Sequence, residues 1–252
     1  MQGTKQERTN RKKKIAAIFL LILAALLILG FLIFSLTYYH AEGAPEYPAQ
    51  GKVSIIESGD YTFYDGPGDS RALIFYPGAR VDSKAYEDLL YQTAEQGTDC
   101  FLVDMPLHLA IFGKNRAEDI LESYDYDIWI MGGHSLGGVM ASSFAADQTD
   151  RVRGLVFLAS YTTKDFSGSP DIRALSVYGS RDQVLKMDAY EEAKGNLPKD
   201  SLVEKVIQGG NHAGFAWYGP QKGDGEAEIS KEEQIRQTAG FIAEFANGLA
   251  GS

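Results

Sequence analysis

The hydrophobic pattern divides the chain into one uninterrupted apolar run and a longer part in which apolar segments are short. From residue 15 to residue 36 no side chain is charged, and apart from Gly30 and Ser35 all are apolar. After residue 51, short apolar runs typical of buried strands alternate with amphipathic stretches typical of helices. This alternation predicts an α/β domain with a mainly parallel sheet covered by helices on both faces.

The order of the elements follows from these runs and from the capping residues between them. Asp82 or Ser83 can cap a helix over 83–96, and Ser230 to Glu233 form a capping-box pattern before the last helix. We predict strands at residues 53–56, 61–64, 72–76, 100–103, 128–131, 152–158, 174–178 and 202–207, and further helices at residues 115–123 and 139–146.

The apolar run over 15–36 is long enough to cross a membrane. A helix rises about 1.5 Å per residue, so about 20 residues span the roughly 30 Å of hydrocarbon in a bilayer. The flanking charges are Arg8, Arg11, Lys12, Lys13 and Lys14 before the run and Glu42 and Glu46 after it. By the positive-inside rule, the amino terminus is expected in the cytoplasm and the rest of the chain outside.

A cleaved signal peptide is the alternative, because it also has a basic start and an apolar core. Its apolar region is usually only about 7 to 15 residues long. After Leu36 the sequence Tyr38-Tyr39-His40 offers no clear small-x-small cleavage site. We therefore favour an uncleaved anchor, with Tyr38 and Tyr39 at the outer headgroup level.

These features divide the chain into four parts. A basic cytoplasmic tail (1–14) precedes the transmembrane anchor (15–36), and a short linker with Pro45 and Pro48 (37–51) leads to the folded domain (52–252). About 200 residues in that last part suffice for one domain with a sizeable core.

A candidate nucleophile lies between a predicted strand and a predicted helix. Ser135 stands in Gly133-His134-Ser135-Leu136-Gly137, a G-x-S-x-G pentapeptide that follows the apolar run Ile128 to Met131 and precedes the helix-like stretch Val139 to Ala146. A serine on such a sharp turn has its hydroxyl exposed, with glycines relieving the crowding. The helix that follows points N–H groups and its positive dipole end at the same place.

The general base is chosen from four histidines. His40 has no strand to position it, His134 leaves the turn in a different direction from Ser135, and His108 is read as structural. His212 follows the strand-like run Leu202 to Ile207 and is surrounded by glycines. We therefore predict His212 as a mobile general base at a strand end.

The acid is expected between the serine and the histidine, since this arrangement requires the order Ser, Asp or Glu, His. Asp182 follows the apolar run Ala174 to Tyr178 and a turn, and so satisfies that order. The rival carboxylates Asp99 and Asp104 precede the serine, and Asp188 falls in the next predicted helix. Asp182 is the predicted acid of a Ser-His-Asp triad, in which it orients the imidazole and stabilises the imidazolium.

An oxyanion hole needs a second N–H besides that of Leu136. The predicted strand ending at Tyr76 is followed by Pro77-Gly78-Ala79-Arg80, the position from which such a donor usually comes. Proline has no N–H. We assign the donor to Ala79, with Gly78 as the alternative.

These segments resemble the α/β-hydrolase superfamily, specifically its small bacterial members with a membrane-anchored amino terminus. The resemblance runs from about Arg71 to the final helix. It is carried by Phe75-Tyr76-Pro77-Gly78-Ala79, Asp104-Met105-Pro106-Leu107-His108-Leu109-Ala110, Gly133-His134-Ser135-Leu136-Gly137-Gly138 and Gly209-Gly210-Asn211-His212-Ala213.

This resemblance implies the α/β-hydrolase fold, and it implies Ser135, Asp182 and His212 as the triad, in agreement with the choice made from the residues. One departure is Pro77-Gly78, where many members have His-Gly.

Lids in the superfamily commonly follow the strand after the nucleophile helix. Here only residues 160–173 separate that strand from the next, which leaves no room for a cap domain and predicts an open pocket.

Charge and cysteine content exclude several other classes. Six of the 24 basic and one of the 34 acidic residues precede the apolar run, so the rest carries 18 basic against 33 acidic residues, a net charge of −15. Such a surface disfavours nucleic acid and close adsorption to anionic lipid. Cys100 is the only cysteine, which excludes an intramolecular disulfide. It has no accompanying cysteine or histidine cluster, and we expect no metal site and no cofactor.

The sequence therefore predicts a membrane-tethered serine hydrolase that cleaves a carboxylic ester, with a small or lipid-like acyl ester as substrate. Acyl transfer, thioester cleavage and peptide cleavage by the same residues remain alternatives. A noncatalytic, membrane-tethered binding module is the alternative from another class. The acyl chain, the leaving group and the oligomeric state are not fixed by the sequence.

Overall fold

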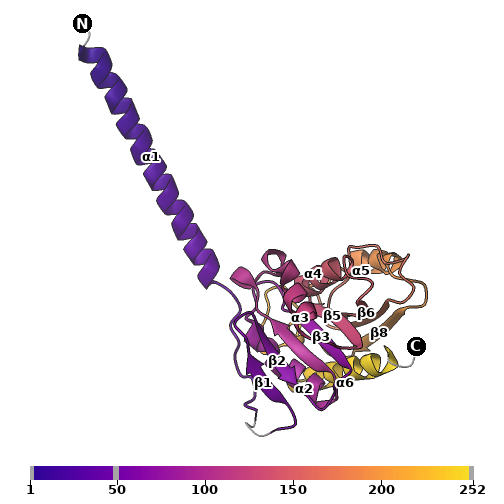
Figure 1. Ribbon diagram of the computed structural model, residues 1–252. Helices are drawn as coiled ribbons and strands as arrows, with labels where there is room; N and C mark the ends of the chain where they lie inside the picture. The colour runs from indigo at the N-terminus through magenta and orange to yellow at the C-terminus, as the bar shows by residue number, and fades with distance from the viewer. Residues whose placement is uncertain (1–2, 48–50, 250–252) are drawn as a thin grey trace. The chain divides into compact units, whose positions relative to one another are not determined.

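The computed structural model describes residues 3–47 and 51–249 and divides the chain into two compact units, 1–38 and 39–252. In the first unit, a single long helix, α1 (Gly3–Leu36), contains the apolar run (Figure 1). Its segment Thr9–Leu36 has a mean hydropathy of 3.2, which is long and apolar enough to cross a membrane. A signal sequence near an amino terminus would meet the same criterion.

The second unit is built on an eight-stranded sheet with the order β1-β2-β4-β3-β5-β6-β7-β8. The pairs β1/β2 and β2/β4 are antiparallel and all the others are parallel, as predicted for a mainly parallel sheet. The strands are β1 (Ser54–Glu57), β2 (Tyr61–Asp65), β3 (Arg71–Tyr76), β4 (Asp99–Val103), β5 (Ile128–His134), β6 (Val152–Leu158), β7 (Arg173–Gly179) and β8 (Leu202–Ile207).

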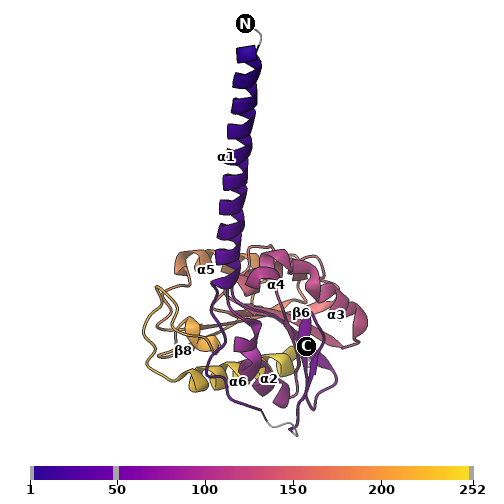
Figure 2. The ribbon, with the colours of Figure 1, turned by 90° about the vertical axis from the view of Figure 1, so that its left-hand side faces the viewer.

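Helices cover both faces of this sheet (Figures 1 and 2). One core, which includes Leu89, Leu90 and Ile242, lies under α2 (Glu87–Glu95) and α6 (Lys231–Leu249). The other core lies under α3 (Ala117–Ser123) and α4 (Leu136–Ala145). On that side α5 (Met187–Ala193) is held by a 2.9 Å hydrogen bond between the hydroxyls of Tyr190 and Ser176. Short 3-10 turns lie at Ser83–Tyr86, Pro106–His108, Ala110–Phe112, Lys114–Arg116, Lys194–Asn196 and Ala213–Phe215.

The strands predicted over 152–158 and 202–207 have the same bounds in the structure. The first is mostly apolar and buried, whereas the second is an edge strand that includes Glu204 and Lys205 and in which only Ile207 is buried. The predicted caps are also confirmed. Asp82 accepts the N–H of Lys84 at 3.2 Å, and the Ser230 hydroxyl accepts the N–H of Glu233 at 3.2 Å. The helix predicted over 83–96 begins as a 3-10 turn, and that predicted over 115–123 starts two residues later.

The connection between β6 and β7 decides how open the carboxyl edge of the sheet is. Residues 159–172, all of which are described, contain no helix and no strand. The expectation that no cap domain is inserted there is therefore confirmed.

Residues 39–47, which we call the strap, belong to the second unit and contact its loops, although the predicted linker includes them. The Tyr39 N–H donates to the Arg80 carbonyl at 2.7 Å, and the Tyr39 carbonyl accepts the N–H of Asp82 at 2.9 Å. Further along, the Glu42 N–H donates to the Trp217 carbonyl at 2.9 Å. The strap thus pairs with two loops of the domain; residues 48–50 of the predicted linker lie outside the described residues.

Candidate active site

Ser135 occupies a strained turn between β5 and α4. Its φ of 53° and ψ of −124° are values that residues with side chains seldom adopt. The turn is possible because its neighbours are glycines: a Cβ at Gly133 would lie 2.5 Å from the carbonyl carbon of Gly137. This backbone directs a half-buried serine side chain away from the strand, as in a nucleophile elbow.

Asp182 and His212 meet at the same edge of the sheet. Asp182 Oδ2 lies 2.9 Å from His212 Nδ1, and the two side chains are 2 % and 1 % exposed. Asp182 Oδ1 accepts the N–H groups of Val184 and Leu185, both at 2.8 Å, so the carboxylate is fixed. Because the carboxylate accepts from Nδ1–H, the lone pair of His212 is left on Nε2, the tautomer that a general base needs.

Hydrogen bonds from two other segments reach the loop that carries His212, which was predicted as a mobile base. Gln234 of α6 accepts the N–H of Asn211 at 3.0 Å, and Asp224 accepts the N–H of Ala213 at 2.9 Å. The other oxygen of Asp224 accepts the N–H of Gln183 at 3.3 Å, next to the acid. The glycines around His212 therefore allow close packing instead of motion: a Cβ at Gly210 would lie 2.7 Å from Gln234 Oε1.

His212 lies beside the turn that carries Ser135, because its ring packs against the ring of His134. The two imidazole rings have centroids 4.5 Å apart, and His134 is the residue directly before Ser135. His212 Nε2 is buried and has no hydrogen-bond partner among the described residues. Within the same residues the Ser135 hydroxyl makes no hydrogen bond, so the Ser135–His212 contact stays a prediction; such contacts often tighten only when substrate binds.

Two backbone N–H groups are left for an oxyanion. Those of Ala79 and Leu136 have no acceptor among the described residues. The N–H of Gly78, the alternative donor, instead donates to the Tyr86 hydroxyl at 3.0 Å. This geometry favours Ala79 over Gly78, and Leu136 is the first residue of α4, where the positive end of the helix dipole adds to the N–H.

Tyr86 links this turn to the elbow. Its hydroxyl lies 2.7 Å from His134 Nδ1 while it accepts from Gly78. Burial first, and then the neighbouring His212, hold the pKa of His134 well below its usual value, so this ring is neutral. The hydroxyl has no other acceptor among the described residues, so we assign its hydrogen to His134 Nδ1. His134 therefore hydrogen-bonds to Tyr86.

The rival residues lie in other environments. Asp99 accepts from the Tyr126 hydroxyl at 2.6 Å and the Gly66 N–H at 2.8 Å, and Asp104 accepts from the Ser83 hydroxyl. Asp188 lies in the first turn of α5. His108 is half-buried with its pKa lowered mainly by burial, and its carbonyl accepts the Arg80 N–H at 2.7 Å. These contacts are structural.

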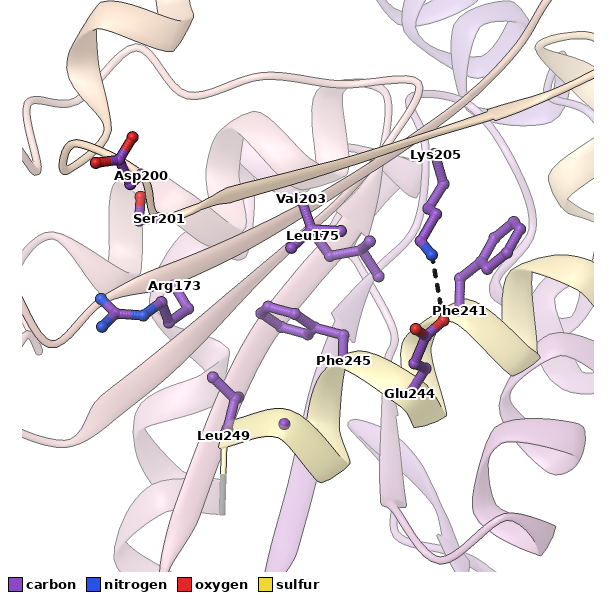
Figure 3. A pocket seen from close by; sticks show the side chains of 11 residues that line it. Arg173, Leu175, Asp200, Ser201, Val203, Lys205, Phe241, Glu244, Phe245 and Leu249 are labelled. Atoms are coloured by element: carbon purple, nitrogen blue, oxygen red, sulfur yellow. Dashed lines mark hydrogen bonds and ion pairs between the residues drawn. The ribbon is translucent and has the colours of Figure 1, made fainter. Parts of the chain in front are cut away.

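A hollow with a volume of about 340 Å³ lies at the opposite edge of the sheet, between β8 and α6 (Figure 3). Phe245, Leu249 and Val203 give it an apolar lining, and Lys205 forms an ion pair with Glu244 at 3.2 Å across its rim. It adjoins the amino ends of β7 and β8, whereas Ser135, Asp182 and His212 follow the carboxyl ends of their strands. It is therefore not the candidate site.

Sequence reasoning missed several residues that position the site. Tyr86 was not identified as a contact of His134, and Asp224 and Gln234 were not identified as contacts of the histidine loop. The signal for Tyr86 was its hydroxyl, because a buried tyrosine usually has a hydrogen-bond partner. No group of three or more His, Cys, Asp or Glu side chains able to hold a metal occurs among residues 3–47 and 51–249.

This elbow and this sheet order define an α/β hydrolase, and comparison with known families agrees. The alpha/beta hydrolase family profile matches residues 72–236, so the chain belongs to that family. A curated relative, a protein named "Putative non-heme haloperoxidase" from Mycobacterium phage D29, is 32% identical over 101 residues. That match covers 36% of this chain and 36% of the relative, so the chain spans about a third of its length.

Solved structures share the fold. Est1E from Butyrivibrio proteoclasticus superposes with a TM-score of 0.58 at 14% identity, over 80% of this chain and 100% of that chain. TT1662 from Thermus thermophilus gives 0.56 at 15% identity, over 78% and 99%. At these identities the likeness concerns the fold alone. The family supports hydrolase activity.

Proposed function

We propose that this protein is a serine hydrolase that cleaves a carboxylic ester through an acyl-enzyme. The observation that carries the proposal is the Asp182–His212 hydrogen bond of 2.9 Å, which leaves a buried, unpartnered Nε2 beside the strained turn of Ser135. A carboxylate-oriented imidazole beside a serine hydroxyl is the arrangement that activates the hydroxyl.

In the proposed reaction, His212 Nε2 takes the hydroxyl proton as Ser135 Oγ attacks the ester carbonyl carbon. The N–H groups of Ala79 and Leu136 stabilise the negative charge on the carbonyl oxygen. The C–O bond to the alcohol then breaks, and the imidazolium gives its proton to the leaving oxygen. Water, deprotonated by His212, attacks the acyl-enzyme, releasing the carboxylic acid and restoring Ser135.

We further propose that α1 is an uncleaved membrane anchor with the catalytic unit on the outer face of the membrane. Support comes from the length and hydropathy of the segment Thr9–Leu36 and from the basic residues before it. Protease added to intact cells should cut the second unit. If it stays uncut while an external control protein is cut, this orientation is wrong.

A fluorophosphonate probe tests the enzyme assignment directly, because it forms a covalent bond with an activated serine. The full chain should be labelled, and Ser135→Ala should abolish both labelling and ester hydrolysis. Ser160→Ala is the matched control: Ser160 lies in the adjacent segment, where its hydroxyl donates to the Ser135 carbonyl at 2.6 Å. Folded protein that is not labelled would instead favour a noncatalytic binding module.

The acceptor that clears the acyl group needs a separate assay. The same three residues can pass the acyl group to an alcohol or amine, or cleave a thioester or peptide. Acyl transfer, thioesterase and peptidase activity therefore remain alternatives. The name of the phage relative adds hydrogen peroxide as an acceptor to include. Comparing acyl-enzyme breakdown in water alone with breakdown in the presence of each acceptor separates these reactions.

A further inference from the structure

Beyond the anchor, the second unit exposes an apolar pair at the edge of the sheet that carries Ser135. Ile111 and Phe112 are 55% and 60% exposed, the most exposed large apolar side chains of the described residues after the strap. They lie in the 3-10 turn Ala110–Phe112, within the connection that follows the carboxyl end of β4. Side chains this apolar and this exposed indicate an interaction surface.

The charges around this apolar pair are neutralised locally. Lys114 forms an ion pair with Asp147 at 3.1 Å, and Arg116 forms one with Asp60 at 3.0 Å. Residues 105–116 themselves contain no acidic residue, although the chain after the apolar run has a net charge of −15, 18 basic against 33 acidic residues. No acidic side chain of this connection therefore opposes contact of Ile111 and Phe112 with a lipid surface.

Hydrogen bonds tie this connection to the oxyanion turn, and the oxyanion turn to the strap. Arg80, next to the donor Ala79, gives its N–H to the His108 carbonyl at 2.7 Å, and its own carbonyl accepts the N–H of Tyr39 at 2.7 Å. Ile111 is therefore only three residues along the chain from His108, whose carbonyl is bonded directly to the oxyanion turn.

Chain length then limits how far this edge can be from the end of α1. Only Thr37 and Tyr38 separate Leu36 from Tyr39. Three residue steps span at most about 11 Å when fully extended, whatever the orientation of the two units. If α1 crosses a membrane as proposed above, Tyr39 and its partner Arg80 stay close to the bilayer surface.

We propose that Ile111 and Phe112 insert into the lipid bilayer that holds α1, and that the active site takes its ester from that bilayer. The partner is a lipid surface, and the substrate class is a membrane-resident acyl ester. This inference rests on the proposed function and anchor. It places the oxyanion turn beside the source of substrate, so the ester need not enter bulk water.

Direct insertion can be measured without any activity. Cys100 is fully buried, and burial raises the pKa of its thiol, so a single new surface cysteine can be labelled selectively. The full chain with Ile111→Cys, carrying an environment-sensitive fluorophore, is placed in phosphatidylcholine vesicles with brominated acyl chains. The label should be quenched. The same label on Val203→Cys, 45% exposed in the native chain near the amino end of β8, should not be.

Equal quenching, or none, at the two positions would overturn the proposal. A chain that does not float with the vesicles would overturn both the anchor and the lipid surface. Loss of fluorophosphonate labelling on Ser135 would reject the enzyme assignment alone, because the quenching experiment needs no reaction. The two failures can therefore be told apart.

The second measurement is the ratio of turnover of a membrane-embedded ester to turnover of a water-soluble ester. In the double variant I111S/F112S, turnover of an ester embedded in phosphatidylcholine vesicles should fall at least about tenfold relative to turnover of a water-soluble short-chain ester, since burying even one of the two side chains is worth about that factor. The matched double variant V203S/V206S removes two exposed apolar side chains from β8 and should keep the ratio. An unchanged ratio in I111S/F112S would contradict the proposal.

Discussion

The two edges of the central sheet differ in backbone strain. Among the described residues, six other than glycine have positive φ, and five of them (Arg80, Leu107, His108, Ser135 and Ala159) follow the carboxyl ends of β3 to β6. The opposite edge has only Asp200, although the hollow between β8 and α6 lies there. Strain persists where surrounding contacts enforce it, and here it is concentrated around the candidate site and not around the hollow.

The contrast extends to charged contacts. Asp182 and His212 are almost fully buried and share one hydrogen bond, whereas Lys205 and Glu244 form a solvent-accessible ion pair, with side chains 30% and 70% exposed. Exposed pairs contribute little, about 0 to 1 kcal/mol, while a buried polar network fixes geometry. Matched substitutions of Asp182 and Glu244 should therefore have very different effects on activity.

The largest difference is expected from Asp182→Asn. Its amide would reverse the hydrogen bond to His212 Nδ1 and place the ring hydrogen on Nε2, where it blocks proton transfer from Ser135. We expect kcat for ester hydrolysis to fall by about 10³- to 10⁴-fold. Glu244→Gln, the matched change at the other edge, should stay within about twofold of the native rate, because surface substitutions are nearly neutral. Equal losses in both variants would break the comparison.

A smaller effect is expected from Tyr86→Phe. The change removes the acceptor of the Gly78 N–H and the donor to His134 Nδ1, which loosens the turn that holds Ala79. We expect about a tenfold fall in kcat with little change in KM, together with about 1 to 3 kcal/mol of lost stability. Tyr190→Phe removes another buried hydroxyl, bonded to Ser176 and Glu204, and controls for stability. Parallel losses of kcat in both variants would mean that Tyr86 is only structural.

The smallest effect concerns stability at acid pH. Because burial lowers the pKa of His134 in the folded state, the unfolded chain binds its proton first as the pH falls below about 6.5. The stabilising contribution is therefore present above that pH and is lost as the pH falls toward the folded pKa. Thermal denaturation at pH 5 and 7.5 should show a smaller difference in Tm for His134→Gln than for the native chain. An undiminished difference would assign the acid sensitivity to other groups.

Much of the fold was predictable because it depends on residues close together in the sequence. The mostly apolar run of β6 identifies a buried strand, and the glycines around Ser135 identify its turn. The candidate acid and base were selected by chain order, and the structure brings Asp182 and His212 together. Local pattern and topology were sufficient for these features.

The parts that could not be predicted depend on contacts between distant residues. The Gly78 N–H has a partner, Tyr86, that no pattern near Pro77 reveals. The histidine loop was expected to be mobile from its glycines, but Gln234 fixes it from the last helix. The strap was interpreted as a linker from its prolines, because strand-like pairing through Tyr39 uses backbone groups that leave no mark in composition.

The strap also determines where the chain can be shortened. Removing the apolar helix by starting a truncated protein at residue 51 would delete Tyr39 and Glu42 as well, leaving the carbonyls of Arg80 and Trp217 without their present donors. One of these carbonyls belongs to the turn beside Ala79. A soluble form beginning at Tyr38 would keep both bonds, so the choice of start site could decide whether the isolated domain is active.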